Sequence, residues 1–200
     1  MLRVLGRATS GNVQKVVWLL EELGIPYKRE DYGRQFNNTG DAAYLALNPN
    51  GKVPTLVDGD TVVWESNTIL RYLAAKVGGG KFYPADPAAR SQVDRWMDWQ
   101  LGTLNIPYLG IFREAKKPAA ERAASWDADA KELKALLEIL DKSMAGRPWI
   151  TGAEMSLADF ALGPIIHRCL DFPIDLPELA GLRAWREKIA ARPAFQKATR

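Results

Sequence analysis

The spacing of apolar residues changes along the chain, and the change divides it into two parts. Up to about residue 77, short runs typical of strands alternate with stretches whose apolar residues recur at helical spacing. The predicted order is strand, helix, strand, helix, strand, strand, helix, over residues 2–5, 12–23, 27–32, 41–47, 53–57, 61–64 and 66–77. A crossover joins the first two strands and a tight turn joins the last two, so a mixed sheet is expected.

The first predicted helix is amphipathic. Its apolar stripe consists of Val13, Val16, Val17, Leu20 and Leu23, and Gly24 with Pro26 ends the helix. The opposite face carries Gln14, Lys15, Glu21 and Glu22. The pattern predicts that these four polar residues face solvent.

A run of three glycines, residues 78–80, marks the boundary between the parts. The predicted organisation is a sheet-containing domain over residues 1–78, a linker over 79–87 and an all-helical domain over 88–200. Helices are expected at about 88–117, 125–144, 156–170 and 179–191, with Pro107 splitting or kinking the first and a final turn after Arg192.

Three residues of the helical part look chemically conspicuous but are assigned structural roles. Ser156 and Asp159 have the spacing of a helix capping box, so Asp159 is expected to support folding. Cys169 lies within a helical pattern and is expected to be a small buried residue. His167 is the single histidine and has no companion ligands, which argues against a metal site.

Composition excludes several classes of protein. Hydrophobic residues make up 47% and charged residues 26% of the 200 positions, as in ordinary globular proteins. The net charge of +3 is scattered and gives no basic run for nucleic acid. We find no apolar stretch of membrane-spanning length and no signal peptide, and the single cysteine precludes an intramolecular disulfide. A cytoplasmic protein is expected.

The segment 48–67 contains the most informative chemistry. The pair Asp58-Gly59 between two apolar runs predicts a β-hairpin, and Pro54 holds Val53 extended beside it. An extended residue can pair with a peptide backbone. Ser66 is predicted to be the N-cap of the next helix, whose N-terminus suits a carboxylate, while Glu65 suits an ammonium group. The segment therefore suits a small zwitterionic peptide.

Lys52-Val53-Pro54, followed by Glu65-Ser66, resembles the glutathione-binding signature of the soluble glutathione transferases. The stretch from Gly152 to Phe160 is similar to the capping-box region of their helical domain, so the resemblance covers nearly the whole chain. It implies a thioredoxin-like first domain, a cis proline, glutathione as cosubstrate and no metal. It assigns glutathione binding to Lys52, Val53, Pro54, Glu65 and Ser66.

The resemblance is closest to the serine-using, theta-like bacterial type. Ser10 stands two residues before the start of the first helix, where that type has the serine that stabilises the glutathione thiolate. Ser10-Gly11-Asn12 is also similar to bacterial arrangements in which two side chains reach the sulfur, so Asn12 is a second candidate. The alternative role for Ser10, or for Thr9, is to cap the helix.

The resemblance further implies an apolar electrophile as second substrate, and a homodimer. By position, the second substrate is assigned to Arg7, Ala8, Tyr108, Phe112 and Arg113. The predicted function is transfer of the glutathione thiolate to small electrophiles. Two alternatives are open: a glutathione-dependent disulfide or peroxide reductase that uses the same site, and a non-catalytic binding or scaffold protein with the same fold.

Overall fold

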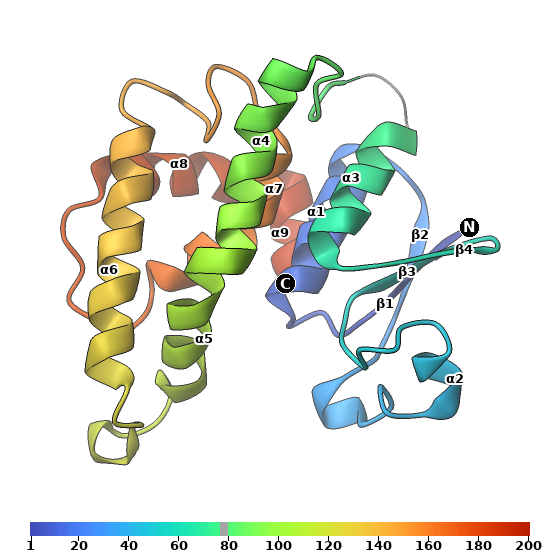
Figure 1. The fold of residues 1–200 in the computed structure, drawn as a ribbon, viewed down its shortest axis with the longest axis horizontal. Helices are drawn as coiled ribbons and strands as arrows, with labels where there is room; N and C mark the ends of the chain where they lie inside the picture. Colours follow the sequence, from blue (N-terminus) through green and yellow to red (C-terminus); the bar gives the residue numbers. More distant parts are fainter. Residues whose placement is uncertain (77–79) are drawn as a thin grey trace. The chain divides into compact units, whose positions relative to one another are not determined.

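The computed structural model describes residues 1–76 and 80–200, which form two compact units (Figure 1). The first unit comprises Met1–Pro84 together with Ala190–Arg200, and the second comprises Ala85–Ile189. The predicted end of one helix at Val77 and the predicted domain boundary at residues 78–79 lie outside the described residues.

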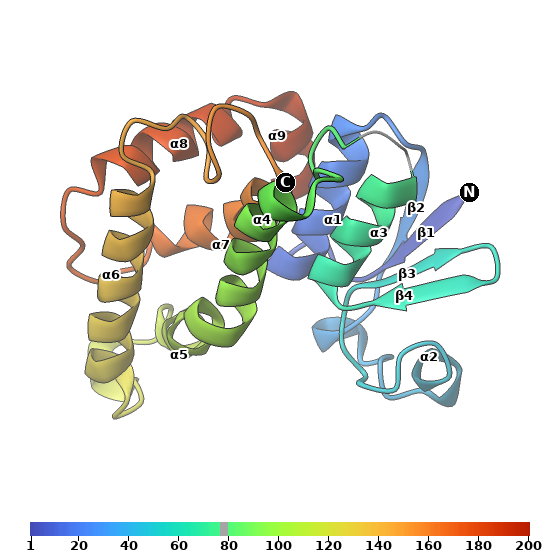
Figure 2. The same ribbon diagram turned by 45° about the horizontal axis from the view of Figure 1, so that its top comes forward.

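The first unit contains a four-stranded mixed sheet in the order β2-β1-β3-β4. Strand β1 (Leu2–Leu5) pairs in parallel with β2 (Tyr27–Glu30) and antiparallel with β3 (Thr55–Asp58), and β3 pairs antiparallel with β4 (Thr61–Trp64). Figure 2 shows the β3–β4 hairpin beside β1. The predicted mixed sheet is confirmed, although β3 begins at Thr55 and not at Val53.

The helices of this unit are α1 (Gly11–Glu22), α2 (Ala42–Leu45), α3 (Ser66–Lys76) and α9 (Pro193–Thr199), with a 3₁₀ turn η1 (Arg34–Phe36) before α2. Helix α1 packs against both α3 and α9. It is therefore buried on several sides, and the prediction of a solvent-facing polar side is wrong for Gln14 (4% exposed) and Lys15 (0%). The spacing of apolar residues predicted one buried face of α1, but it did not indicate that α3 would cover another.

The chain's last helix, α9, packs on α1 and so belongs to the sheet-containing unit. The ring of Phe195 meets Trp18 edge to face, with centroids 4.9 Å apart. Arg192 Nη2 donates to Glu22 Oε2 at 2.7 Å, and Lys197 Nζ donates to Glu21 Oε2 at 2.9 Å. The predicted boundary kept residues 190–200 with the helical part, because nothing local reveals contacts made across 170 residues of sequence.

The Arg192–Glu22 ion pair leads to a prediction about acid stability. Burial by itself would raise the pKa of Glu22, but the hydrogen bonds from Arg192 and Trp18 hold it below its usual 4.5. A lowered carboxyl pKa stabilises the fold above pH 4.5, and this contribution is lost as the pH falls through the folded-state pKa. We expect Arg192→Met to reduce the free energy of unfolding by about 1 kcal/mol at neutral pH, since Arg192 is partly exposed.

Urea unfolding at neutral pH and at successively lower pH measures this effect, because the loss caused by Arg192→Met should shrink as Glu22 becomes protonated. Lys134→Met removes the exposed 3.9 Å ion pair with Asp175 and serves as the control, with little change expected at any pH. An equal loss from Arg192→Met at every pH would contradict the prediction.

The second unit is all-helical among the described residues, apart from one isolated bridge between Trp149 and Gly152. Its helices are α4 (Pro87–Trp99), α5 (Asn105–Glu114), α6 (Trp126–Ser143), α7 (Leu157–Cys169) and α8 (Ala180–Ala190), with a 3₁₀ turn η3 (Ala119–Glu121). The combination of a mixed sheet and an all-helical unit confirms the predicted fold class. None of the described helices is both long and apolar enough to cross a lipid bilayer.

Pro107 interrupts the long helical stretch as predicted. Between α4 and α5 the chain forms a π-helical segment, η2 (Gln100–Leu104). Proline has no N–H to donate to the carbonyl four residues earlier, so regular α-helical bonding to Thr103 is impossible. The structure accommodates this loss by a local change of helical pitch at a site just before the proline.

The predicted capping box at the start of α7 is confirmed. Asp159 is 0% exposed and its carboxylate accepts four hydrogen bonds. Oδ1 accepts from Ile150 N at 3.1 Å and Trp185 Nε1 at 2.8 Å, and Oδ2 accepts from Ser156 N at 2.8 Å and Ser156 Oγ at 3.3 Å. Burial raises the pKa of Asp159 to about 6, although the four donors oppose the rise. The group ties α7, the preceding loop and α8 together.

Candidate functional site

The first turn of α1 and the loop before β3 meet at Gly6, which follows the end of β1. A Cβ atom on Gly6 would lie 2.5 Å from Val13 Cγ2 and 3.2 Å from Val53 Cβ. Only glycine allows the first turn of α1 to approach the loop before β3 this closely. Lys15 of α1 in turn contacts Asn67 at the start of α3. The entrance of α1, the Val53–Pro54 loop and the start of α3 therefore lie together.

Ser10 occupies the N-cap position of α1, with extended backbone (φ −81°, ψ 122°). Its carbonyl accepts the Gln14 N–H at 2.9 Å, but its side chain makes no capping hydrogen bond. The residue is 7% exposed. The hydroxyl is thus not committed to capping α1, which was the alternative role for this serine.

Asn12 lies in the first turn of α1. Its Oδ1 atom is buried and has no hydrogen-bond partner among the described residues. The first turn also contains no acidic side chain, so the positive end of the helix dipole is unopposed there. The amide of asparagine has an oxygen that accepts and an NH₂ group that donates, so rotation of the amide lets Asn12 either accept from an N–H or donate to an anion.

The Val53–Pro54 peptide bond is cis. The residue before it, Lys52, has an exposed side chain but a firmly held carbonyl oxygen. That oxygen accepts from Tyr44 Oη at 2.6 Å and Asn48 Nδ2 at 2.9 Å, and both donors also lie within 3.0 Å of Thr55 Oγ1. Tyr44, Asn48 and Thr55 are all buried. This interior network fixes the loop that presents the Val53 backbone.

The start of α3 is held in an unusual backbone conformation. Glu65 has φ +68°, which is rare for a residue other than glycine and is typical of functional sites. Its carbonyl accepts the Ile69 N–H at 2.9 Å, and Ser66 is already the first residue of the helix. The predicted N-cap at Ser66 is therefore wrong by one residue, and Glu65 holds that position. Glu65 is exposed, whereas Ser66 is 3% exposed.

Two residues of this region were not predicted as part of a site. Lys15 is fully buried, and its Nζ lies 3.5 Å from Oδ1 of Asn67, which is itself 1% exposed. Burial lowers the pKa of Lys15 to about 7, and the negative charge of Glu65 opposes the fall. No signal in the sequence could have singled out Lys15, because its burial depends on a helix 50 residues away.

The residues predicted to contact a second substrate are divided between the two units. Arg7 and Ala8 follow β1, and the Arg7 guanidinium lies close to Gly33. In α5, Tyr108 is 4% exposed and stacks on Phe112, with centroids 5.6 Å apart, while Arg113 is exposed. Tyr108 belongs to the core of its unit. The assignment of these five residues to a second substrate stays a prediction.

The remaining conspicuous side chains of the second unit have structural contacts. Cys169 is fully buried, and burial raises the pKa of its thiol. His167 Nδ1 accepts from Arg186 Nε at 3.3 Å, and burial together with the nearby arginine charge lowers the histidine pKa. Among the described residues, no cluster of histidine, cysteine and acidic side chains could hold a metal ion.

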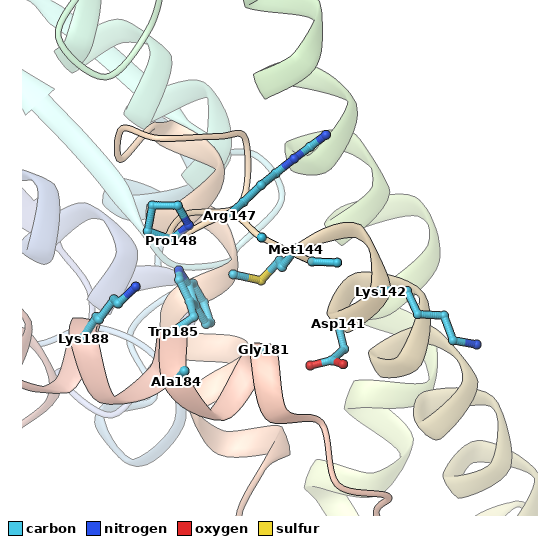
Figure 3. Close-up of a pocket in the computed structure, with 11 residues that line it drawn as sticks. Asp141, Lys142, Met144, Arg147, Pro148, Gly181, Ala184, Trp185 and Lys188 are labelled. Carbon is cyan, nitrogen blue, oxygen red and sulfur yellow. The ribbon is translucent and has the colours of Figure 1, made fainter.

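A groove of about 620 Å³ lies in the second unit, where the end of α6 and the following loop meet α8 (Figure 3). Asp141, Arg147, Trp185 and Lys188 are among its lining residues. Asp141 already accepts the Leu182 N–H at 2.8 Å, and Trp185 is bound to Asp159. None of the predicted site residues lines this groove.

The fold and the site define a protein with a thioredoxin-like unit that presents an extended backbone segment and two helix N-termini, followed by an all-helical unit. Comparison with known sequences agrees: residues 9–76 match the glutathione S-transferase N-terminal domain, and residues 104–193 match the glutathione S-transferase C-terminal domain.

Comparison with individual proteins agrees with the two domain matches. Glutathione S-transferase GstB of Escherichia coli K12 is 39% identical over 98% of this chain and 97% of its own length. The crystal structure of a theta class glutathione S-transferase from Xanthomonas axonopodis pv. citri with glutathione bound is 40% identical. It has a TM-score of 0.93 over 99% of this chain and 96% of that one. The chain belongs to the glutathione S-transferase family.

Proposed function

We propose that this glutathione S-transferase binds glutathione along the Val53–Pro54 loop and the start of α3, and transfers the thiolate to small, mostly apolar electrophiles. The observation that carries the proposal is the convergence at Gly6 of the entrance of α1 with that loop. The theta class relative from Xanthomonas was crystallised with glutathione, which supports the choice of cosubstrate.

In the proposed complex, each part of the tripeptide has a matching group. The Val53 backbone pairs with the cysteinyl backbone by strand addition, and the Glu65 carboxylate holds the γ-glutamyl ammonium. The γ-glutamyl carboxylate meets Ser66 and the N-terminus of α3. Lys52, which is exposed, pairs with the glycyl carboxylate.

The chemistry takes place at the entrance of α1. A free thiol has a pKa of about 8.5, so lowering that pKa by about two corresponds to roughly 2.7 kcal/mol of thiolate stabilisation. The Ser10 hydroxyl donates a hydrogen bond to the sulfur, Asn12 supplies a second donor, and the α1 dipole adds to both. The thiolate then forms a C–S bond with the electrophile, whose leaving group departs with the bonding electrons.

A second candidate function is reduction of disulfides by glutathione. The disulfide-bond oxidoreductase YfcG of E. coli K12 is 30% identical over 96% of this chain and 91% of its own length. The thiolate would attack one sulfur of the substrate and release the other as a thiolate. Cys169 is buried and has no part in such an exchange. Activity toward an aryl halide compared with a dialkyl disulfide distinguishes the two functions.

We also propose that the protein works as a cytoplasmic homodimer, without a metal ion and without nucleic acid as a partner. The modest net charge of +3 favours no polyanion, and the described residues contain no cluster of side chains that could hold a metal ion. Analytical ultracentrifugation measures the oligomeric state directly.

Titration with glutathione while the ultraviolet absorbance of the thiolate is recorded tests the proposed function. We expect a saturable rise at neutral pH, where free glutathione is mostly protonated. If the absorbance does not rise and calorimetry detects no binding, the enzyme proposal fails and the non-catalytic scaffold alternative is favoured.

A further inference from the structure

Helix α1 contains a lysine whose surroundings oppose its charge. Lys15 is 0% exposed, and burying an ammonium group away from water is strongly unfavourable. The group also lies at the N-terminal end of α3, where the helix dipole disfavours a cation. An apolar side chain of similar length would avoid both penalties. The lysine therefore needs an explanation other than the stability of α1.

The contacts of Lys15 point to the first turn of α3. Its Nζ approaches Oδ1 of the buried Asn67 at 3.5 Å, and the Glu65 carboxylate interacts favourably with its charge. These two residues flank Ser66. Lys15 thus contacts the start of α3 directly at Asn67 and interacts with Glu65 through its charge.

That segment begins with a residue in an unfavourable backbone conformation. Glu65 has φ +68°, a conformation that costs free energy for any residue with a Cβ and persists only where neighbouring contacts impose it. The Ile69 N–H bond to the Glu65 carbonyl is one such contact. The charge of Lys15, when the group is protonated, also attracts the Glu65 carboxylate, and its Nζ contacts Asn67 two residues further along.

We propose that Lys15 is a positioning residue of the glutathione site, which holds Glu65 and Asn67 in the arrangement that receives the γ-glutamyl group. The inference rests on the proposed function. Lys15 does not touch the ligand, because it is fully buried; it acts through Glu65 and Asn67. It belongs to the γ-glutamyl end of the site, whereas Ser10 belongs to the thiol end.

Lys15→Met provides the main test, since methionine fills a similar volume without charge. We expect the folded protein to be as stable as the wild type or more so, because replacing a buried charge by an apolar group relieves desolvation. Glutathione affinity should nevertheless fall about tenfold, the effect of losing roughly one well-placed polar contact. The KM for glutathione should rise with little change in kcat or in the pKa of the bound thiol.

Three further variants make the result specific. Lys15→Arg keeps a cation and should recover part of the affinity. Val16→Ala perturbs a neighbouring, equally buried position of α1 and should lower stability while leaving the dissociation constant of glutathione unchanged. In the Glu65→Gln background, Lys15→Met should weaken glutathione binding much less than in the wild type, because the two residues act together.

The outcomes distinguish failure of the proposed function from failure of the role proposed for Lys15. If wild-type protein does not bind glutathione, the proposed function fails. If it binds glutathione and Lys15→Met binds it equally well, or loses stability and affinity together as Val16→Ala loses stability, the positioning role of Lys15 is overturned. Equal effects of Lys15→Met with and without Glu65→Gln would overturn the route through Glu65.

Discussion

Replacing Ser10 with alanine is expected to lower kcat/KM by roughly 10- to 100-fold at neutral pH, because hydrogen bonds to charged groups contribute about 1.5–3 kcal/mol. The hydroxyl stands at the entrance of α1 and makes no capping bond to the helix, so removing it should disturb α1 little. The pKa of the bound glutathione thiol should rise by about one to two, and the pH profile of kcat/KM should move upward with it.

Spectroscopic titration of the bound thiol and steady-state rates across pH measure both effects. Ser10→Thr retains a hydroxyl and should keep much of the activity. Thr9→Ala removes the neighbouring exposed hydroxyl and is the matched control, for which we expect wild-type kinetics. If Ser10→Ala leaves the thiol pKa unchanged, the assignment of Ser10 is wrong, even though the family assignment stands. A large effect of Thr9→Ala would transfer the role to Thr9.

Replacing Asp159 with alanine is expected to destabilise the helical unit by about 3–5 kcal/mol. The change removes the carboxylate that accepts four hydrogen bonds. The N–H groups of Ile150, Ser156 and Trp185 then lose their acceptor. An unsatisfied buried donor costs about 1–3 kcal/mol, and the three groups are buried. The loss should appear in urea unfolding and in thermal melting, with the thiol pKa of bound glutathione unaltered in the protein that remains folded.

Two variants define the origin of that loss. Asp159→Asn keeps the shape but presents an NH₂ group to one of the two donor pairs, so it should destabilise the unit substantially, though less than alanine does. Asp141→Ala removes a partly exposed cap that accepts a single N–H, from Leu182, and should cost only about 1 kcal/mol. Equal losses for Asp141→Ala and Asp159→Ala would show that the buried network is not what stabilises α7.

A functional role for Asp159 is disfavoured by the same geometry. Its carboxylate is fully enclosed and both oxygens are occupied by donors from its own unit. Burial raises its pKa to about 6, a value that would suit a catalytic acid, but the group has no access to a substrate. The perturbed pKa here reports burial in a folding element.

The sequence by itself determined those features that depend on neighbouring residues. The Asp58-Gly59 turn, the Ser156–Asp159 capping box and the interruption at Pro107 were all predicted, because each arises within a few residues of chain. The resemblance of Lys52-Val53-Pro54 and Glu65-Ser66 to one family was also readable, since these residues lie within a single hairpin and helix start.

Only the tertiary structure decided features that join distant segments. Lys15 belongs to the buried side of α1 because α3 covers it, across 52 residues of sequence, and α9 returns to α1 across about 170. The positive φ of Glu65 has no sequence signal, because a residue other than glycine adopts it only when surrounding contacts impose it. Local periodicity reports one apolar face of a helix, whereas burial on its remaining sides depends on which elements the fold places there.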